Sequence, residues 1–458
     1  MARQTSRTVT FPDQQSAGPQ AVTPTSFVIQ EVKMVANNGE SFEFTDLVQK
    51  ITVQESLYRG SLDVDVYVYD AVNFLESVKI SANEEISILI QRSESGDSKK
   101  FDMKLNIAEI MHYSKPKPGA QIYVLKCISQ HAFLNSLIQY NRSFKGSIGN
   151  EISKICKDIG ISDDRKHVNT ESKEVIQGIY PKLRPLRAIQ WLTRNAFDDD
   201  TPFFFYETLK GGVYFDSYKS MVEKEDFGTY THSPFFETEQ QVGTSEGYEA
   251  EKYKIRKIAS SYNNSQFISS AEGAYASTVH TLDIAKKEYN TYKYSYDNSI
   301  QKLNNEDPYI KEMKFKGSSL SDYPESKQYF ISLNSKSFGD TLKNYHSPCN
   351  PTIHKAEAHM SCIDGITQTI ILPGDFDIEV GVPIYLEILR TEFREENSNL
   401  KIDKLLSGRY LIINIKHVFD TKYLIECECK KDSFITPLND IVDKIETEAN
   451  EVIVEEGT

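Results

Sequence analysis

Three histidines and two cysteines lie close together after residue 345, at His346, Cys349, His354, His359 and Cys362. Imidazole nitrogen and thiolate sulfur are preferred zinc ligands, so we tested their spacing. On a strand, His354 and Cys362 would point to one side and His359 to the other. On a helix, the five-residue step from His354 to His359 turns by about 140°. Neither geometry brings the ligands together, so we expect surface histidines and core cysteines, and no metal site.

The pair Cys427 and Cys429 has the residue types of a redox centre. On a strand, however, both cysteines would lie on one face with Ile425, while Glu426 and Glu428 would face water. We therefore expect the two thiols to be buried small hydrophobic groups.

The run Asp198–Asp200 stands before Thr201-Pro202 and is a candidate for a metal or catalytic carboxylate cluster. Consecutive aspartates after a helical segment more often form a solvated loop, which is the interpretation we favour. Scattered acids elsewhere cannot be paired as a glycosidase acid and nucleophile from sequence alone. The sequence has no P-loop, dinucleotide glycine fingerprint, His-Glu-x-x-His motif or nucleophile elbow. We expect no enzyme activity, no catalytic residue and no cofactor.

Composition restricts the class of protein further. The 458 residues include 66 acidic and 52 basic side chains, a net charge of −14, which disfavours phosphate contacts and therefore specific nucleic-acid binding. The length suggests roughly three domains. No apolar run reaches the ~20 residues that span a bilayer, and Met1–Pro24 lacks the apolar centre of a signal peptide, so we expect a soluble chain outside the general secretory route. Six thinly spread cysteines indicate a reducing compartment rather than a disulfide framework.

A first block of strands is predicted between Phe27 and Ile128. In Leu62–Tyr69, hydrophobic and polar residues alternate strictly, which is typical of a half-buried antiparallel strand. Turn residues at Asn37–Gly39 and Lys115–Gly119 separate neighbouring strands. The other predicted strands are Phe27–Val35, Ile51–Leu57, Glu85–Arg92, Phe101–Ile110 and Gln121–Ile128.

Two helices are predicted after this block. In Ser147–Gly160 the apolar residues fall on one helical face, with Ser147 as N-cap and Gly160 just beyond the C-terminus. Pro185–Phe197 suits a second helix, because proline is favoured in a first turn and Leu186, Ile189, Leu192 and Ala196 form an apolar stripe.

Strands return after Pro202. Phe203–Tyr218 predicts a β-hairpin around Gly211-Gly212, and residues 263–340 are polar with weak periodicity, which predicts a loop-rich insertion. Thr436–Val454 has the pattern of an amphipathic helix with an acidic face. The later predicted strands are His354–Cys362, Gly365–Leu372, Pro383–Leu389, Gly408–Phe419 and Tyr423–Cys429.

Together these patterns predict an α+β, mainly β protein with two strand-built domains, a helical domain and an insertion. The expected division is residues 1–25 as a flexible arm, 26–130 as the first barrel-like domain, 131–202 as a helical intermediate domain, 203–262 plus 340–434 as the second barrel-like domain, 263–339 as the insertion and 435–458 as an acidic C-terminal helix.

Four groups of residues, in order along the chain, resemble the baseplate hub proteins of contractile-tailed phages, which are related to the hub part of type VI secretion spike proteins. Each group alone is weak, and their order carries the resemblance, which covers roughly Phe27 to Phe434. The groups are Ile179–Pro181 with Leu186–Leu192, Arg194, Ala196, Pro202–Thr208 and Gly211–Ser217; Gly273–Ser277 with Leu282-Asp283; Leu372–Asp375 with Gly381; and Ser407–Ile412 with His417, Tyr423 and Lys431–Ser433.

The resemblance implies a structural hub in the virion, assembled in the host cytoplasm. Such a hub is a homotrimeric ring whose chains each carry two tube-like β-barrel domains, so that it joins a six-fold tail tube to a three-fold central spike. The ring would form part of the DNA-ejection channel. The implied partners are the tail tube protein, the spike, the baseplate wedge proteins and the tape measure protein.

Alternatives remain open at this point. A spike-fused protein of the type VI secretion kind would continue into further domains, so here we expect the spike to be a separate polypeptide. A tail-associated cell-wall-degrading enzyme and a glycan-binding tail protein are the rivals from other classes. The polar arm, the insertion outside Gly273–Asp283 and the helix at Thr436–Val454 match none of the motifs, and we expect Thr436–Val454 to dock a partner.

Overall fold

The computed structural model describes residues 23–37, 39–81, 83–93, 98–169, 175–198, 201–232, 248, 251–262, 270–284, 286–295, 314–333, 358, 366–389, 402–403 and 406–431. The predicted N-terminal arm, apart from its last residues, and the predicted helix Thr436–Val454 lie outside this set. So do Asp199, Asp200 and the whole histidine–cysteine group from His346 to Cys362.

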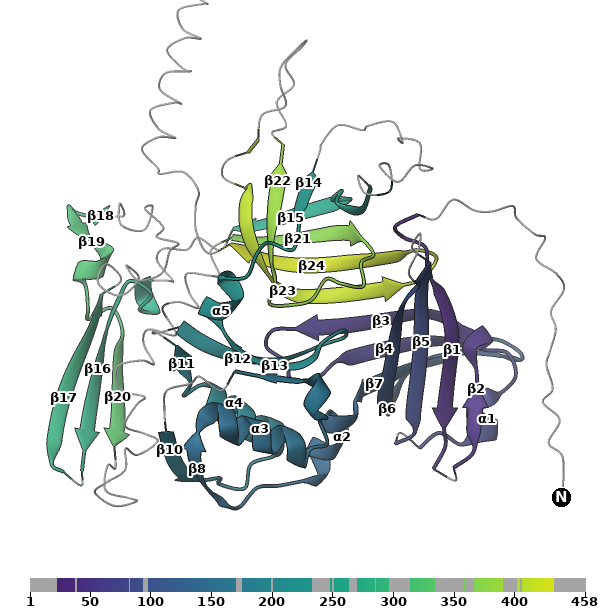
Figure 1. The fold of residues 1–458 in the computed structure, drawn as a ribbon, viewed down its shortest axis with the longest axis horizontal. Helices are drawn as coiled ribbons and strands as arrows, with labels where there is room; N and C mark the ends of the chain where they lie inside the picture. Colours follow the sequence, from purple (N-terminus) through teal and green to yellow (C-terminus); the bar gives the residue numbers. More distant parts are fainter. Residues whose placement is uncertain are drawn as a thin grey trace, which may run out of the picture.

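Most strands belong to one large sheet, which crosses the molecule in Figure 1. It has 13 strands, in the order β15-β21-β24-β23-β3-β4-β7-β6-β5-β1-β2, with β22 attached to β23 and β14 to β22. The strands before residue 130 are β1 (Val28–Val35), β2 (Ser41–Glu43), β3 (Val48–Ser56), β4 (Asp63–Asp70), β5 (Glu85–Ser93), β6 (Ser98–Lys117) and β7 (Ala120–Ser129). The later ones are β14 (Thr229–His232), β15 (Lys257–Tyr262), β21 (Ile366–Pro373), β22 (Pro383–Ile388), β23 (Gly408–Phe419) and β24 (Tyr423–Lys431).

The predicted strands from the two ends of the chain meet at β3 and β23. These strands pair antiparallel from Ser56 opposite Asn414 to Ile51 opposite Phe419, so the two strand blocks form one continuous sheet. Among the described residues no barrel closes, and the sheet path ends at β15 and β2. The sequence predicted two barrel-like domains because each block alternates on its own, and local alternation carries no information about pairing between blocks.

One hydrophobic core lies along the large sheet, and residues from both strand blocks contribute to it. Val64, Val66 and Val68 of β4 are buried, as the alternation predicted. On β24, Cys427 and Cys429 are also fully buried. Both cysteines therefore lie on the apolar face, which confirms the sequence interpretation of this pair.

The helical region follows β7. It contains α2 (Gln130–Leu137), α3 (Ile148–Asp158) and α4 (Pro185–Thr193), whereas the short helices α1 (Phe74–Val78) and α5 (Tyr218–Val222) lie elsewhere. For α3 the prediction is confirmed, because Ser147 Oγ accepts a hydrogen bond from Asn150 N and Gly160 has a φ of +81° just after the helix.

The helix α4 begins at Pro185 as predicted but ends at Thr193, before the predicted Phe197. Thr193 Oγ1 donates to the carbonyl of Ile189, and Asn195 Nδ2 donates to the carbonyl of Trp191. The bond from Asn195 gives a partner to Trp191, whose carbonyl is one of the last four in the helix and would otherwise lack one. Phe197 instead begins the short strand β11 (Phe197–Asp198).

The predicted hairpin forms β12 (Thr201–Thr208) and β13 (Gly212–Ser217), but it does not join the second strand block. It pairs with β11 and with β9 (Lys166–Val168) of the helical region, which corrects its predicted place. The reason is that β12 is buried on both faces, so its pattern does not indicate a single neighbour. Phe203 and Phe205 pack in the core of the helical region, and Phe204 and Tyr206 in the core of the large sheet.

Two smaller sheets complete the fold. β8 (Ser143–Ser147) pairs with β10 (Val175–Ile179) beneath the helices. The insertion, predicted to be loop-rich, contains a three-stranded sheet of β16 (Ala276–Asp283), β17 (Glu288–Ser295) and β20 (Gln328–Leu333), set apart from the large sheet (Figure 1). β17 is exposed along most of its length, so it lacks the alternation that reveals a strand. The short pieces β18 (Lys314–Phe315), β19 (Ser318–Ser319) and the 3-10 turns at Thr45–Leu47, Asp163–Arg165 and Leu320–Asp322 complete the described elements.

No helix in the described parts of the chain is long and apolar enough to cross a bilayer.

Candidate functional site: a polar sheet face and a buried polar junction

The face of the large sheet opposite the core carries charged and other polar side chains from both strand blocks; we call it the polar face. On it, Lys126 of β7 lies opposite Asp65 of β4 on one side and Glu109 of β6 on the other. In the second block, Lys416 of β23 lies opposite Glu426 of β24. Opposite charges at directly facing positions attract each other across a sheet.

Neutral donors also contact the acids of the polar face. Asn414 Nδ2 donates to Glu428 Oε2 at 2.6 Å, and Thr52 Oγ1 donates to Asp65 Oδ2 at 3.5 Å. A surface that holds DNA concentrates lysine and arginine, so that several cations meet successive phosphates. On the polar face, by contrast, Lys126 and Lys416 are each matched by facing carboxylates.

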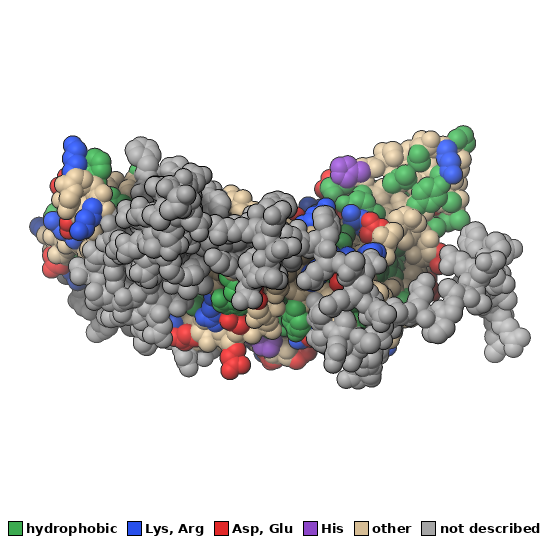
Figure 2. All heavy atoms as spheres, turned by 90° about the horizontal axis from the view of Figure 1, so that it is seen from above, with side chains coloured by type: hydrophobic (Ala, Val, Ile, Leu, Met, Phe, Trp, Pro, Cys, Tyr) green, Lys and Arg blue, Asp and Glu red, His purple; other side chains and the backbone are tan. Residues whose placement is uncertain are grey.

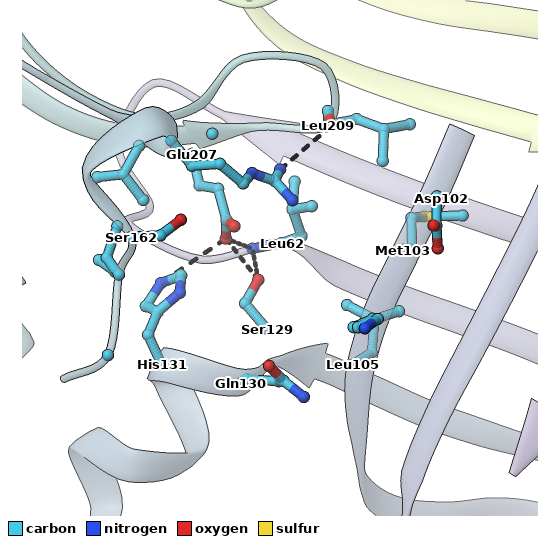
Figure 3. Close-up of a pocket in the computed structure, with 16 residues that line it drawn as sticks. Leu62, Asp102, Met103, Leu105, Ser129, Gln130, His131, Ser162, Glu207 and Leu209 are labelled. Atoms are coloured by element: carbon cyan, nitrogen blue, oxygen red, sulfur yellow. Dashed lines mark hydrogen bonds and ion pairs between the residues drawn. The ribbon is translucent and has the colours of Figure 1, made fainter. Parts of the chain in front are cut away.

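A cavity of about 320 Å³ lies between the large sheet, the helical region and the β12–β13 hairpin (Figure 3). The carboxylate of Glu207, from β12, lies at one side of it and is 7% exposed. Its Oε2 accepts a hydrogen bond from Leu62 N at 2.9 Å and another from the hydroxyl of Ser129, and it lies 3.7 Å from His131 Nε2. Leu62 N also donates to Ser129 Oγ at 3.0 Å. We call these four residues the Glu207 junction.

Serine, histidine and glutamate together are the residue types of a hydrolase triad, but their bonds here are different. In a triad the serine hydroxyl donates to the imidazole, and the carboxylate orients the other ring nitrogen. In this protein the hydroxyl of Ser129 donates directly to Glu207, and His131 Nε2 bonds the carbonyl of Gly60 at 2.7 Å. The arrangement ties the end of β7 and the start of α2 to β12, which is a structural role.

A second buried polar group joins the two strand blocks and the hairpin. Glu55 Oε1, on β3, accepts a hydrogen bond from Leu209 N at 2.7 Å and lies 3.5 Å from His417 Nε2 on β23. His417 Nδ1 lies 2.9 Å from the hydroxyl of Tyr423 on β24, which donates to the carbonyl of Asp375 at 3.0 Å. All of these side chains are buried, so their bonds specify how the strands fit together.

Two acids in the loop after β21 have shifted pKa values. Burial raises the pKa of Glu379, and the nearby charge of Glu55 raises it further. For Asp377, burial acts to raise the pKa, but hydrogen bonds from Lys99 and Lys210 outweigh it and the pKa is lowered. Lys210 Nζ lies 3.0 Å from Asp377 Oδ1, so this acid joins the hairpin loop to the loop after β21.

Residues of the resemblance motifs hold these loops together. A Cβ on Gly374 would lie 1.9 Å from the ring of Tyr423, so only glycine fits there, and its carbonyl accepts a hydrogen bond from Arg92 Nη1 at 2.7 Å. Lys431 Nζ donates to the carbonyl of Ser407 at 2.7 Å. These four motif residues therefore lie where loops pack against the sheet.

The structure describes only some of the residues that the sequence analysis named as candidate sites. Burial raises the pKa of both Cys427 and Cys429, so neither thiol readily ionises. Within the described ranges, no group of three or more histidine, cysteine or acidic side chains has a geometry that could hold a metal ion. The predicted histidine–cysteine group and most of the Asp198–Asp200 run are outside those ranges.

Sequence reasoning missed the roles of Glu55 and Glu207. A signal was available for Glu207, because it directly follows the aromatic run Phe203–Tyr206, and an acid beside such a run needs buried partners.

Known structures provide the remaining comparison. No family model matches the sequence, and no curated protein matches it. The 43 kDa tail protein of prophage MuSo2 from Shewanella oneidensis matches 88% of this chain and 98% of its own, at 11% sequence identity and a TM-score of 0.51. The tail protein from Neisseria meningitidis MC58 matches 89% of this chain and 98% of its own, at 11% identity and a TM-score of 0.48. Prophage tail protein gp18 from Listeria monocytogenes EGD-e matches 91% and 99%, at 8% identity and a TM-score of 0.46.

At such low sequence identity, similarity to a solved structure is evidence of a shared fold only. We base this conclusion on the prophage MuSo2 protein, because its TM-score is above 0.5. At the level of the fold, this comparison agrees with the resemblance that the sequence motifs indicated. The chain has the fold of a phage tail protein.

Proposed function

We propose that this protein is the structural hub of a phage tail baseplate. Three copies form a ring that adapts the six-fold tail tube to the three-fold central spike, and the ring is part of the DNA-ejection channel. The tail tube protein, the spike, the baseplate wedge proteins and the tape measure protein are its partners in the virion, and it assembles in the host cytoplasm. It acts without catalysis, in line with the structural role of the buried serine, histidine and glutamate.

The observation that carries the proposal is the continuous sheet built from two strand blocks. Each block contributes several antiparallel strands, and the seam between β3 and β23 fixes their relative position. Three chains would thus present six strand blocks to the tube, while the ring itself has only three-fold symmetry. In this proposal the two strand blocks are the tube-like domains, residues 26–130 and residues 229–262 with 340–434, and the helical region with the β12–β13 hairpin lies between them in the sequence.

The charge pattern of the polar face supports the proposal that this face lies at the channel wall. DNA must pass a conduit without being held, and each released phosphate contact would slow it. Because Lys126 and Lys416 face carboxylates, these two lysines of the polar face offer DNA little net attraction.

The assembly is tested by native mass spectrometry of the purified full chain, alone and with the neighbouring tail tube protein. We expect a complex of three copies, and a ring in electron micrographs. A chain that stays single at all concentrations and with the tube protein would contradict the proposal. Activity on purified peptidoglycan that single carboxylate substitutions abolish would instead favour the cell-wall-degrading alternative.

The place of the polar face is tested by a charge reversal. The double variant Asp65→Lys and Glu109→Lys replaces both carboxylates that face Lys126. We expect its ring to bind double-stranded DNA in a salt-dependent way, whereas the wild-type ring does not. The control is Glu223→Lys with Glu225→Lys, which makes the same charge change at exposed positions after α5. Equal DNA binding by both variants would show that the polar face has no special position.

A further inference from the structure

The outer edge of β20, in the insertion, has the features of a strand-docking site. We propose that this edge binds an extended, uncharged segment of a partner protein, which adds a fourth strand to the sheet of β17, β16 and β20. The inference concerns a surface outside the large sheet, and it does not depend on the hub role.

The hydrogen-bond pattern defines what the edge can bind. β20 runs parallel to β16, and Thr278 N donates to the carbonyl of Lys327 at 2.9 Å, just before β20 begins. Backbone groups on a strand point to alternate sides. The N–H and C=O groups of Tyr329 and Ile331 therefore point toward β16. Those of Gln328, Phe330 and Ser332 point outward, where no strand of the described residues pairs with them. A row of outward backbone donors and acceptors is complementary to another strand.

This edge lacks the usual protection against pairing. Exposed edge strands commonly carry charges or proline, which prevent unwanted pairing with other chains. On the opposite edge of the same sheet, β17 carries Glu288 and Lys293, and the edge strand β15 of the large sheet carries Lys257. The sequence of β20, Gln328–Leu333, has no charge and no proline. A neutral edge favours a neutral partner strand.

Aromatic rings give the edge a specific feature. Across the three strands, the ring of His280 stacks between Tyr289 and Phe330, with centroid distances of 5.8 and 4.7 Å. Phe330 ends this row and is 74% exposed. Its ring has a stacking partner on the β16 side, and a side chain on an added strand would stack on its other side.

A groove continues the site at the start of β20. A cavity of about 570 Å³ reaches Ser326, two residues before the strand. Its lining includes the apolar and aromatic side chains of Tyr275, Phe315, Leu320 and Tyr323 and the acids Asp322 and Glu325. Phe315 and Tyr323 are both exposed. A segment paired with β20 could place one apolar side chain in this groove. Backbone complementarity, the absence of charge on β20 itself and the apolar side chains of the groove together indicate an extended, uncharged segment with an aromatic residue.

The experiment uses the full chain and a terminally blocked peptide, Ser-Val-Thr-Phe-Thr-Val-Ser, with a fluorescent label. We expect saturable binding by fluorescence anisotropy, and no binding of the same peptide methylated at the backbone nitrogen of phenylalanine. The variant Ser332→Pro removes one outward N–H and should weaken binding about tenfold or more. Phe330→Lys, which places a charge on the edge at an exposed position, should do the same.

The matched control is Ser295→Pro, which removes an outward N–H from the β17 edge by the same alternation. It should leave peptide binding unchanged. Absence of saturable binding, or equal weakening by Ser295→Pro and Ser332→Pro, would overturn the inference. So would a doubling of the wild-type mass in analytical ultracentrifugation that Ser332→Pro abolishes, because the occupant would then be a second copy of this chain.

Discussion

The Glu207 junction provides a quantitative test of how the helical region is held to the large sheet. The perturbation is Glu207→Ala, compared with Glu207→Gln. The carboxylate accepts hydrogen bonds from Leu62 N and from the Ser129 hydroxyl, and both donors are buried. In the glutamine variant the amide oxygen can still accept both bonds, but it carries no charge.

The expected loss follows from these bonds. A hydrogen bond to a charged group contributes about 1.5–3 kcal/mol, and a typical neutral one about 1 kcal/mol. Leu62 N keeps one acceptor in the alanine variant, because it also donates to Ser129 Oγ at 3.0 Å. We therefore expect Glu207→Ala to lower the free energy of unfolding by about 3 kcal/mol and Glu207→Gln by about 1 kcal/mol.

The assay is urea denaturation at pH 7, followed by far-ultraviolet circular dichroism. The control is Glu225→Ala at an exposed position, for which we expect a change within about 0.5 kcal/mol. A loss below about 1 kcal/mol for Glu207→Ala, or equal losses for the alanine and glutamine variants, would refute the idea that the junction contributes to stability.

Three further predictions follow from other buried contacts. Gly374→Ala places a Cβ against the ring of Tyr423 and should cost about 1–3 kcal/mol in the same assay; an unchanged unfolding midpoint would contradict the close approach. The raised pKa of Glu379 means that the folded state holds its proton more tightly, a contribution to stability that is present below the unfolded pKa and lost as pH rises through the folded one. Glu379→Gln should therefore raise the Tm relative to wild type at pH 8 but not at pH 4, and an equal gain at both pH values would exclude this cause. Native alkylation with iodoacetamide, read by peptide mass spectrometry, should leave the buried thiols unmodified until denaturant is added, and rapid labelling in the native state would show that they are accessible: Cys127, Cys156, Cys427 and Cys429.

Most strands of the large sheet could be predicted from local sequence patterns, whereas β2, β14 and β15 were not among the predicted strands. The buried valines of β4 and the two cysteines of β24 follow directly from a period of two. The cap of α3 was equally local, because Ser147 and Gly160 adjoin the helix that they delimit. Local patterns of this kind do not depend on what lies across the sheet.

The rest depended on contacts between distant residues. The seam between β3 and β23 joins residues more than three hundred positions apart, and no local pattern specifies such pairing. The bond from Leu209 N to Glu55 and the bond from Ser129 to Glu207 are likewise long-range. β17 escaped prediction for the opposite reason, since a mostly exposed strand has no buried face to reveal it.

The double burial of β12 has a mechanical consequence. Phe204 and Tyr206 are fixed in one core while Phe203 and Phe205 are fixed in the other, so a single strand is shared by both. If one core unfolded alone, the strand β12 would be displaced and the aromatic rings that it contributes to the other core would be exposed. A load applied to the helical region is therefore transmitted to the large sheet through the backbone of this strand, and the two parts should unfold in one cooperative step.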